Sequence, residues 1–142
     1  RKFDMFKILG VDHIGVAVQD LEEGKKLWSD IIGIPCTNQE TVAEQKVTTT
    51  FHPTPNGSEI ELLIGTAPDS PITKYIEKKG EGIQHVALRV DNIENAIADL
   101  MAKGVRMIDE KPRIGAGGAK IAFLHPKATK GVLLEICEHP DR

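Results

Sequence analysis

The sequence contains an internal repeat in which a short β-like run carries one histidine. The two copies are residues 10–18 and 82–90, and each is followed by an acidic or amide residue and then by a helical pattern. His85 follows His13 by 72 residues. A repeat of this kind constrains the fold most, because each copy is one supersecondary unit. A lone strand histidine is usually a packing residue, but the same histidine in both copies predicts a shared site.

The predicted elements follow the same order in both halves. The first half has strands at 8–18, 34–41, 46–52 and 58–64, with a helix between the first two. That helix starts at the N-cap Asp20 and is stopped by Gly33, and its apolar stripe is expected to pack one face. The second half has strands at 82–90, 119–124 and 132–137, an extended stretch at 105–113, and a helix with a stripe from Ile93 to Met101. Residues 65–81 form a connection with its own helix, capped by Ser70.

Each half also places one glutamate between two aliphatic strand residues. Glu61 lies between Ile60 and Leu62, and Glu135 lies between Leu134 and Ile136. Side chains alternate along a strand, so the glutamates are expected to face away from the helices.

The histidines are expected on the same face as the glutamates, where Gly15, Ala17 and Ala87 leave room. Two carboxylates buried together need a compensating cation or protons. Two imidazoles and two carboxylates suit Co²⁺, Ni²⁺, Mn²⁺, Fe²⁺ or Zn²⁺.

Composition excludes several other classes. The 142 residues carry a net charge of −3, from 18 basic and 21 acidic side chains, without a basic-aromatic stripe. This argues against nucleic acid as a partner. No apolar run approaches the ~20 residues of a membrane span, and no signal-peptide pattern is present. Two cysteines are too few for a disulfide framework, which favours a cytoplasmic setting. Met5 is a candidate natural start, and the four residues before it would then be an added or upstream extension.

Several motifs resemble the vicinal oxygen chelate (glyoxalase-like) superfamily and, within it, the methylmalonyl-CoA epimerase family. The motifs cover nearly the whole chain, at residues 11–18, 60–63, 68–72, 80–87, 114–118, 123–127 and 131–135. The resemblance implies an α+β fold of two βαβββ modules that form a curled mixed sheet cup. It also implies a single domain over residues 1–142, with module one at about 8–64, a linker helix at about 65–81 and module two at about 82–137.

This resemblance implies an isomerase that interconverts (2R)- and (2S)-methylmalonyl-CoA. A divalent metal ion, Co²⁺ first with Zn²⁺, Ni²⁺ or Mn²⁺ as alternatives, would chelate the acyl-CoA substrate and stabilise its enolate. The family's metal ligands fall on His13, Glu61, His85 and Glu135. Some epimerases carry glutamine at the second position, so Glu61 is the glyoxalase-like choice. The resemblance also implies a homodimer.

Epimerisation needs a base on each face of the substrate. In some family members a separate glutamate on the second or third strand takes part, but here Thr49 falls at that place. We therefore predict that Glu61 and Glu135 share the proton transfer, each able to loosen from the metal. Glu44 is a poorer candidate because it falls in a predicted loop.

Other residues are candidates for substrate binding. The turn at 114–118 lacks the Gly-Lys-Ser/Thr ending of a P-loop, but the backbone N–H groups of Gly117 and Gly118 can meet an anionic oxygen. Lys127 is a candidate contact for a CoA phosphate or the substrate carboxylate. His125 precedes a proline and is interpreted as a turn residue, and His52 as a structural histidine.

Other functions on the same fold remain open at this point. A glyoxalase I-type lactoylglutathione lyase uses the same two histidines and two glutamates. An Fe²⁺ extradiol dioxygenase would leave Glu61 as a surplus ligand. A non-enzymatic small-molecule binding protein often lacks the metal ligands. An epimerase that acts on ethylmalonyl-CoA is a further alternative.

Overall fold

The computed structural model describes residues 5–140 of the chain. Contacts divide the chain into two compact units, which are described separately. The central unit is His13–Gln84, and the terminal unit comprises residues 5–12 and 85–140. The boundaries fall inside strands β1 (Ile8–Ala17) and β5 (Gly82–Val90), so each unit carries one of the repeated histidines. Residues 1–4, including those before the candidate start Met5, lie outside the described residues.

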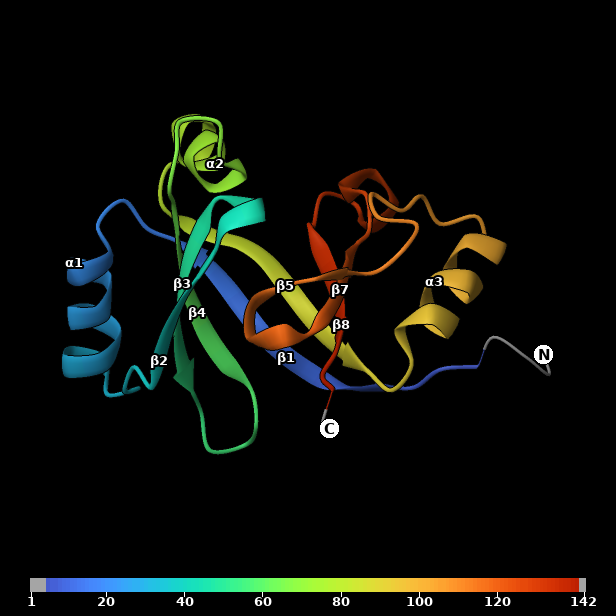
Figure 1. The fold of residues 1–142 in the computed structure, drawn as a ribbon, viewed down its shortest axis with the longest axis horizontal. Coiled ribbons are helices and arrows are strands. Elements are labelled where there is room, and N and C mark those ends of the chain that lie inside the picture. Colours follow the sequence, from blue (N-terminus) through green and yellow to red (C-terminus); the bar gives the residue numbers. More distant parts are fainter. Residues whose placement is uncertain (1–4, 141–142) are drawn as a thin grey trace. The chain divides into compact units, whose positions relative to one another are not determined.

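The central unit contains a four-stranded sheet in the order β2, β3, β4, β1. Strands β2 (Asn38–Val42), β3 (Val47–Pro53) and β4 (Glu59–Gly65) are antiparallel neighbours, and β4 pairs with β1 in parallel. Helix α1 (Leu21–Lys25) continues as a π-helical segment (Lys26–Ile32), and α2 (Pro71–Lys79) follows β4. Figure 1 shows α1 beside the strands of this sheet.

The predicted caps of the central unit are present. The Asp20 carboxylate accepts a hydrogen bond of 3.0 Å from the N–H of Glu23. Ser70 Oγ accepts one of 3.1 Å from the N–H of Ile72. Gly33 ends the first helix with φ = 103°, a value that favours glycine. The helix starts and stops that side-chain chemistry predicts are therefore confirmed.

The predicted apolar stripe of the first helix is wrong in its second half. Gly24 is buried, but Leu27, Ile31 and Ile32 are 45%, 68% and 52% exposed. The segment from Lys26 onward is π-helical. Its i→i+5 hydrogen bonds widen the turn, so side chains spaced for an α-helix move off the packed face.

The terminal unit repeats the same plan in the strand order β5, β8, β7, β6. Strand β5 pairs in parallel with β8 (Leu134–Glu138), and β7 (Lys120–Phe123) pairs antiparallel with both β8 and β6 (Arg113–Ile114). Helix α3 (Ile93–Ala102) begins at Asn92 and lies alongside β7 and β8 (Figure 1). The extended stretch predicted at 105–113 is mostly irregular, since only β6 and an isolated bridge between Met107 and Leu124 form there.

One face of each sheet packs against a helix. In the central unit Leu62 is fully buried, and a Cβ on Gly24 of α1 would lie 3.1 Å from its Cδ1 atom. In the terminal unit Val90, Ala122 and Ile136 of the sheet form one core with Ile93 and Ile97 of α3. The opposite faces are left for the glutamates, as the alternation predicts. No helix within residues 5–140 is long and apolar enough to cross a membrane.

Truncation of Leu62 tests this packing. Leu62→Ala is expected to lower the free energy of unfolding by about 2–5 kcal/mol, because a buried leucine cannot be removed without leaving a cavity. Urea denaturation followed by circular dichroism measures the change. Ile64→Ala, on the same face but partly exposed, should cost less. Equal costs would contradict the packing of β4 on α1.

Candidate active site

The central unit brings His13 and Glu61 together on the sheet face that points away from α1. Glu61 lies directly opposite Gly15 on one side and Phe51 on the other. His13 is two residues before Gly15 and therefore shares that face. Its Nδ1 atom lies 3.3 Å from Glu61 Oε2, and both side chains are 8% exposed. The glycine opposite the carboxylate leaves the space that the imidazole needs.

The terminal unit holds the second pair in the same frame. Glu135 lies opposite Ala87 of β5 and Phe123 of β7. His85 Nε2 lies 3.4 Å from Glu135 Oε1, with side chains that are 7% and 5% exposed. The repeat seen in the sequence is therefore a repeat of buried imidazole–carboxylate pairs.

The spacing within each pair fits two ligands of a divalent ion. Ligand atoms about 2.1 Å from one ion, at adjacent corners of a tetrahedron or octahedron, lie about 3.0–3.4 Å apart. The observed separations of 3.3 and 3.4 Å agree with this value. They are longer than the ordinary length of a charge-assisted hydrogen bond. Imidazole nitrogen and carboxylate oxygen are also the donors that the predicted ions prefer.

Sequence reasoning missed an aromatic ring beside each glutamate. Phe51 pairs with Glu61, and Phe123 pairs with Glu135. The two phenylalanines are 72 residues apart, the same spacing as the two histidines, so this signal was available in the sequence. The Phe123 ring meets the His85 ring edge-on, with centroids 5.6 Å apart and an angle of 81°. Such a contact fixes the orientation of an imidazole.

Thr49 is buried on β3, on the same face as Phe51 and Glu61. Its hydroxyl cannot act as a carboxylate base. Glu40 of β2 lies directly opposite Thr49 in the antiparallel ladder. Glu44 lies in a short 3-10 helix, Ala43–Gln45, and is exposed.

The predicted substrate-binding residues all belong to the terminal unit. Gly117 and Gly118 have φ values of 71° and 76° and are exposed in the turn before β7. Lys127 is exposed, and its N–H donates to His125 Nδ1 at 3.0 Å. Desolvation lowers the pKa of His125, and the charges of Arg106 and Lys127 lower it further. His125 thus caps the turn Pro126–Thr129, as its interpretation as a turn residue predicts.

Two other buried polar groups have structural partners. His52 Nδ1 donates to the carbonyl of Ile34 at 2.9 Å, and its Nε2 lies 3.0 Å from Thr50 Oγ1. These bonds agree with its interpretation as a structural histidine.

A buried ion pair in the terminal unit was not predicted. Asp12 Oδ1 accepts from Arg89 Nε at 2.9 Å and lies 2.7 Å from His139 Nε2. Cys137 is near enough for these groups to resemble a metal site. The Arg89 guanidinium already compensates the Asp12 charge, however, so a salt-bridge network explains the cluster. Sequence spacing could not reveal it, because Asp12 and His139 are 127 residues apart.

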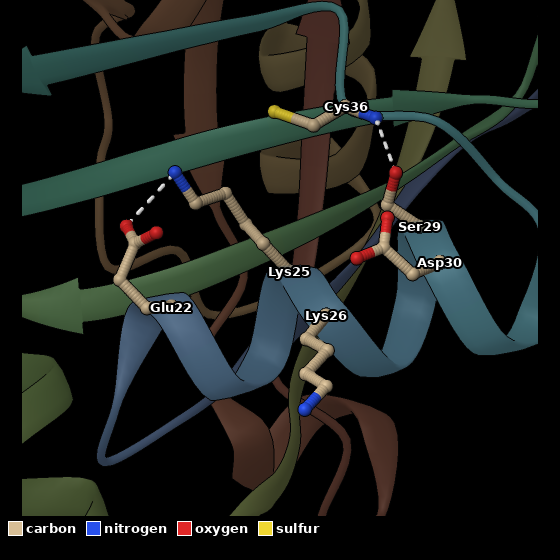
Figure 2. A pocket seen from close by; sticks show the side chains of 6 residues that line it. All are labelled: Glu22, Lys25, Lys26, Ser29, Asp30 and Cys36. Carbon is tan, nitrogen blue, oxygen red and sulfur yellow. Dashed lines mark hydrogen bonds and ion pairs between the residues drawn. The ribbon is translucent and has the colours of Figure 1, made fainter.

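A hollow on the surface of the first helix lies apart from all these residues. Figure 2 shows its lining, which includes Lys25, Ser29 and Cys36. Lys25 pairs with Glu22 at 2.9 Å, and this hydrogen bond raises the lysine pKa. Ser29 Oγ accepts from the N–H of Cys36 at 3.4 Å. None of the predicted site residues lines this hollow.

The fold and the duplicated pairs define the class of protein. Residues 12–123 match the model of the glyoxalase/bleomycin resistance protein/dioxygenase superfamily, which covers most of the chain. The chain belongs to this superfamily. The predicted fold class of two βαβββ modules is thereby confirmed.

Named relatives place the chain more narrowly, among the methylmalonyl-CoA epimerases. It is 38% identical over 129 residues to the mitochondrial methylmalonyl-CoA epimerase of Dictyostelium discoideum, which covers 90% of this chain and 77% of that protein. It is 34% identical over 128 residues to the ethylmalonyl-CoA/methylmalonyl-CoA epimerase of Cereibacter sphaeroides, covering 89% of this chain and 95% of that protein. A solved structure agrees: a variant of the Streptomyces coelicolor methylmalonyl-CoA epimerase in complex with 2-nitronate-propionyl-CoA superposes with a TM-score of 0.90 at 34% identity, over 95% of this chain and 97% of that chain. The resemblance to this family is confirmed.

The two buried histidines of the central unit should respond differently to truncation. His13→Ala is expected to reduce the divalent metal that copurifies with the chain, because it removes a ligand. His52→Ala should keep the metal but lower the free energy of unfolding by about 1–3 kcal/mol, because the Ile34 carbonyl loses its donor. Metal analysis by mass spectrometry and urea denaturation measure the two effects. Equal metal content in both variants would contradict a ligand role for His13.

Proposed function

We propose that this chain is a metal-dependent epimerase that interconverts (2R)- and (2S)-methylmalonyl-CoA. The observation that carries the proposal is the buried imidazole–carboxylate pair in each of two repeated units. The relatives with matching length are named for this reaction. The glyoxalase I-type and non-enzymatic alternatives are not favoured, because no relative reported above carries such a name.

His13, Glu61, His85 and Glu135 are the proposed ligands of one divalent ion. The separations of 3.3 and 3.4 Å within the pairs and the burial of all four side chains support this set. When bound, the ion would act as a Lewis acid toward the thioester oxygen and lower the energy of enolate formation. Co²⁺ is the first choice of metal, with Zn²⁺, Ni²⁺ and Mn²⁺ as alternatives, since all accept nitrogen and oxygen donors.

Glu61 and Glu135 are the proposed bases for the C2 proton. Each is buried, and each lies in the same strand frame as the other. Desolvation makes a carboxylate a stronger base. One would remove the proton from C2 and the other would return a proton to the opposite face. Thr49 offers no ionisable group at the position where some relatives carry a glutamate, so the chain must supply both bases from elsewhere.

The phenylalanines and the turn residues have separate proposed roles. Phe51 and Phe123 would restrict water beside the two carboxylates, which protects an enolate from stray protonation. Lys127 would contact a CoA phosphate or the substrate carboxylate. The N–H groups of Gly117 and Gly118 would meet an anionic oxygen, and their exposure in a left-handed turn supports this role.

Ethylmalonyl-CoA is a second candidate substrate. The Cereibacter sphaeroides relative is named for both acyl-CoA thioesters. The two substrates differ by one methylene group, so their relative kcat/KM values report the size of the alkyl pocket. A homodimer and a cytoplasmic location are further proposals, the first from the family resemblance and the second from cysteines that are free rather than paired.

Solvent proton exchange tests the function directly. Metal-loaded protein in D₂O with one stereoisomer of methylmalonyl-CoA is expected to introduce deuterium at C2 and to destroy stereochemical purity. NMR measures both changes, and the hemithioacetal of methylglyoxal and glutathione serves as a parallel substrate. Isomerisation of the hemithioacetal without exchange at C2 would overturn the proposal in favour of the glyoxalase reaction.

Conservative substitution tests the base assignment. Glu135→Gln and Glu61→Gln are each expected to lower the epimerisation rate by about 10²–10⁴-fold, because an amide cannot accept the proton. Glu44→Gln, on an exposed turn, is the control and should remain near the wild-type rate. Rates are compared at equal metal occupancy, so that loss of metal is not counted as loss of a base. Full activity in Glu135→Gln with metal bound would rule out its role.

A further inference from the structure

The guanidinium of Arg113 is held in place by neighbours on β7 and in the preceding loop. Arg113 Nε donates to Asp109 Oδ1 at 3.1 Å. The other oxygen of Asp109 accepts from the N–H of Phe123 at 2.9 Å. The guanidinium carbon lies 5.7 Å from the centroid of the Phe123 ring. Asp109 and the ring therefore fix a side chain that is otherwise 44% exposed.

The Phe123 ring connects this cation to the buried pair of the terminal unit. The ring contacts His85 edge-on at 5.6 Å, and its residue lies opposite Glu135. Arg113 is thus one aromatic ring away from the imidazole. Its Nε is taken by Asp109, while the two Nη groups carry the remaining donors in a planar fork. Such a fork matches the two oxygens of a carboxylate.

The corresponding place in the central unit has the opposite charge. Arg113 pairs with Ile121, and Glu40 pairs with Thr49. Ile121 follows Thr49 by the repeat spacing of 72 residues, so Glu40 and Arg113 are equivalent by strand register. A negatively charged group is therefore attracted at the terminal unit's position and repelled at the central one.

We propose that Arg113 binds the free carboxylate of the acyl group and so makes the site selective for malonyl-type thioesters. This inference rests on the proposed function and deepens it. The free carboxylate is separated from the thioester carbonyl by a single carbon. The CoA phosphates lie beyond the whole pantetheine arm, much farther than one aromatic ring. Proximity to His85 therefore favours the carboxylate over a phosphate as the partner of Arg113.

The test compares two ligands that differ only in this carboxylate. Dissociation constants of methylmalonyl-CoA and propionyl-CoA are measured by calorimetry for the wild-type chain and for Arg113→Gln at equal metal content. The variant is expected to lose about 10- to 100-fold in affinity for methylmalonyl-CoA, the usual effect of removing a charged hydrogen-bond partner. Its affinity for propionyl-CoA should change little. Arg113→Lys should fall between the two, since it keeps the charge but loses the fork.

Lys111→Gln is the matched control, because it removes an exposed positive charge two residues away and should alter neither constant. Equal losses for both ligands would overturn the proposal and assign Arg113 to the CoA moiety. An unchanged ratio, or a wild-type chain without preference for methylmalonyl-CoA, would also overturn it. Because binding is measured without turnover, failure of the exchange reaction in D₂O is distinguishable from failure of this inference.

Discussion

The burial of a carboxylate beside an imidazole on one sheet face is the constraint on which each unit depends. A buried carboxylate is costly unless a cation or a proton compensates it. The strand period of two residues makes the arrangement possible, since Leu62 and Glu61 point to opposite faces of β4. A shift of one residue would place the glutamate against α1 and the leucine in the site. The packing of the helix and the position of the carboxylate are therefore set by the same register.

The features predicted from sequence are those that depend on neighbours in the chain. The caps at Asp20 and Ser70, the stop at Gly33 and the alternation around Glu61 need only local chemistry, and all are observed. The histidine repeat was also readable, because duplication copies spacing as well as residue type. The first-helix stripe was wrong because a π-helical segment cannot be distinguished from an α-helix by apolar spacing alone.

Other features require the strand pairing itself. Arg113 reaches the site through Asp109 and Phe123, and this path exists only once β6, β7 and β8 are in register. The salt bridge between Asp12 and His139 joins opposite ends of the chain. Strand partners such as Glu40 and Thr49 are separated by a turn whose length the sequence does not fix. These contacts are non-local, so no window of sequence contains both partners.

The two units are alike where the proton is transferred and unlike where the substrate would be oriented. The histidine, glutamate and phenylalanine recur in both, with one spacing and one strand frame. An epimerase needs this likeness, because the C2 proton must leave and arrive on opposite faces with similar ease. It also needs one fixed orientation of the acyl group, which two equal units could not impose. The exchange of Glu40 for Arg113 at equivalent positions breaks the symmetry in charge alone. Duplication would thus account for the paired bases, and divergence at the outer strands for the selection of the substrate.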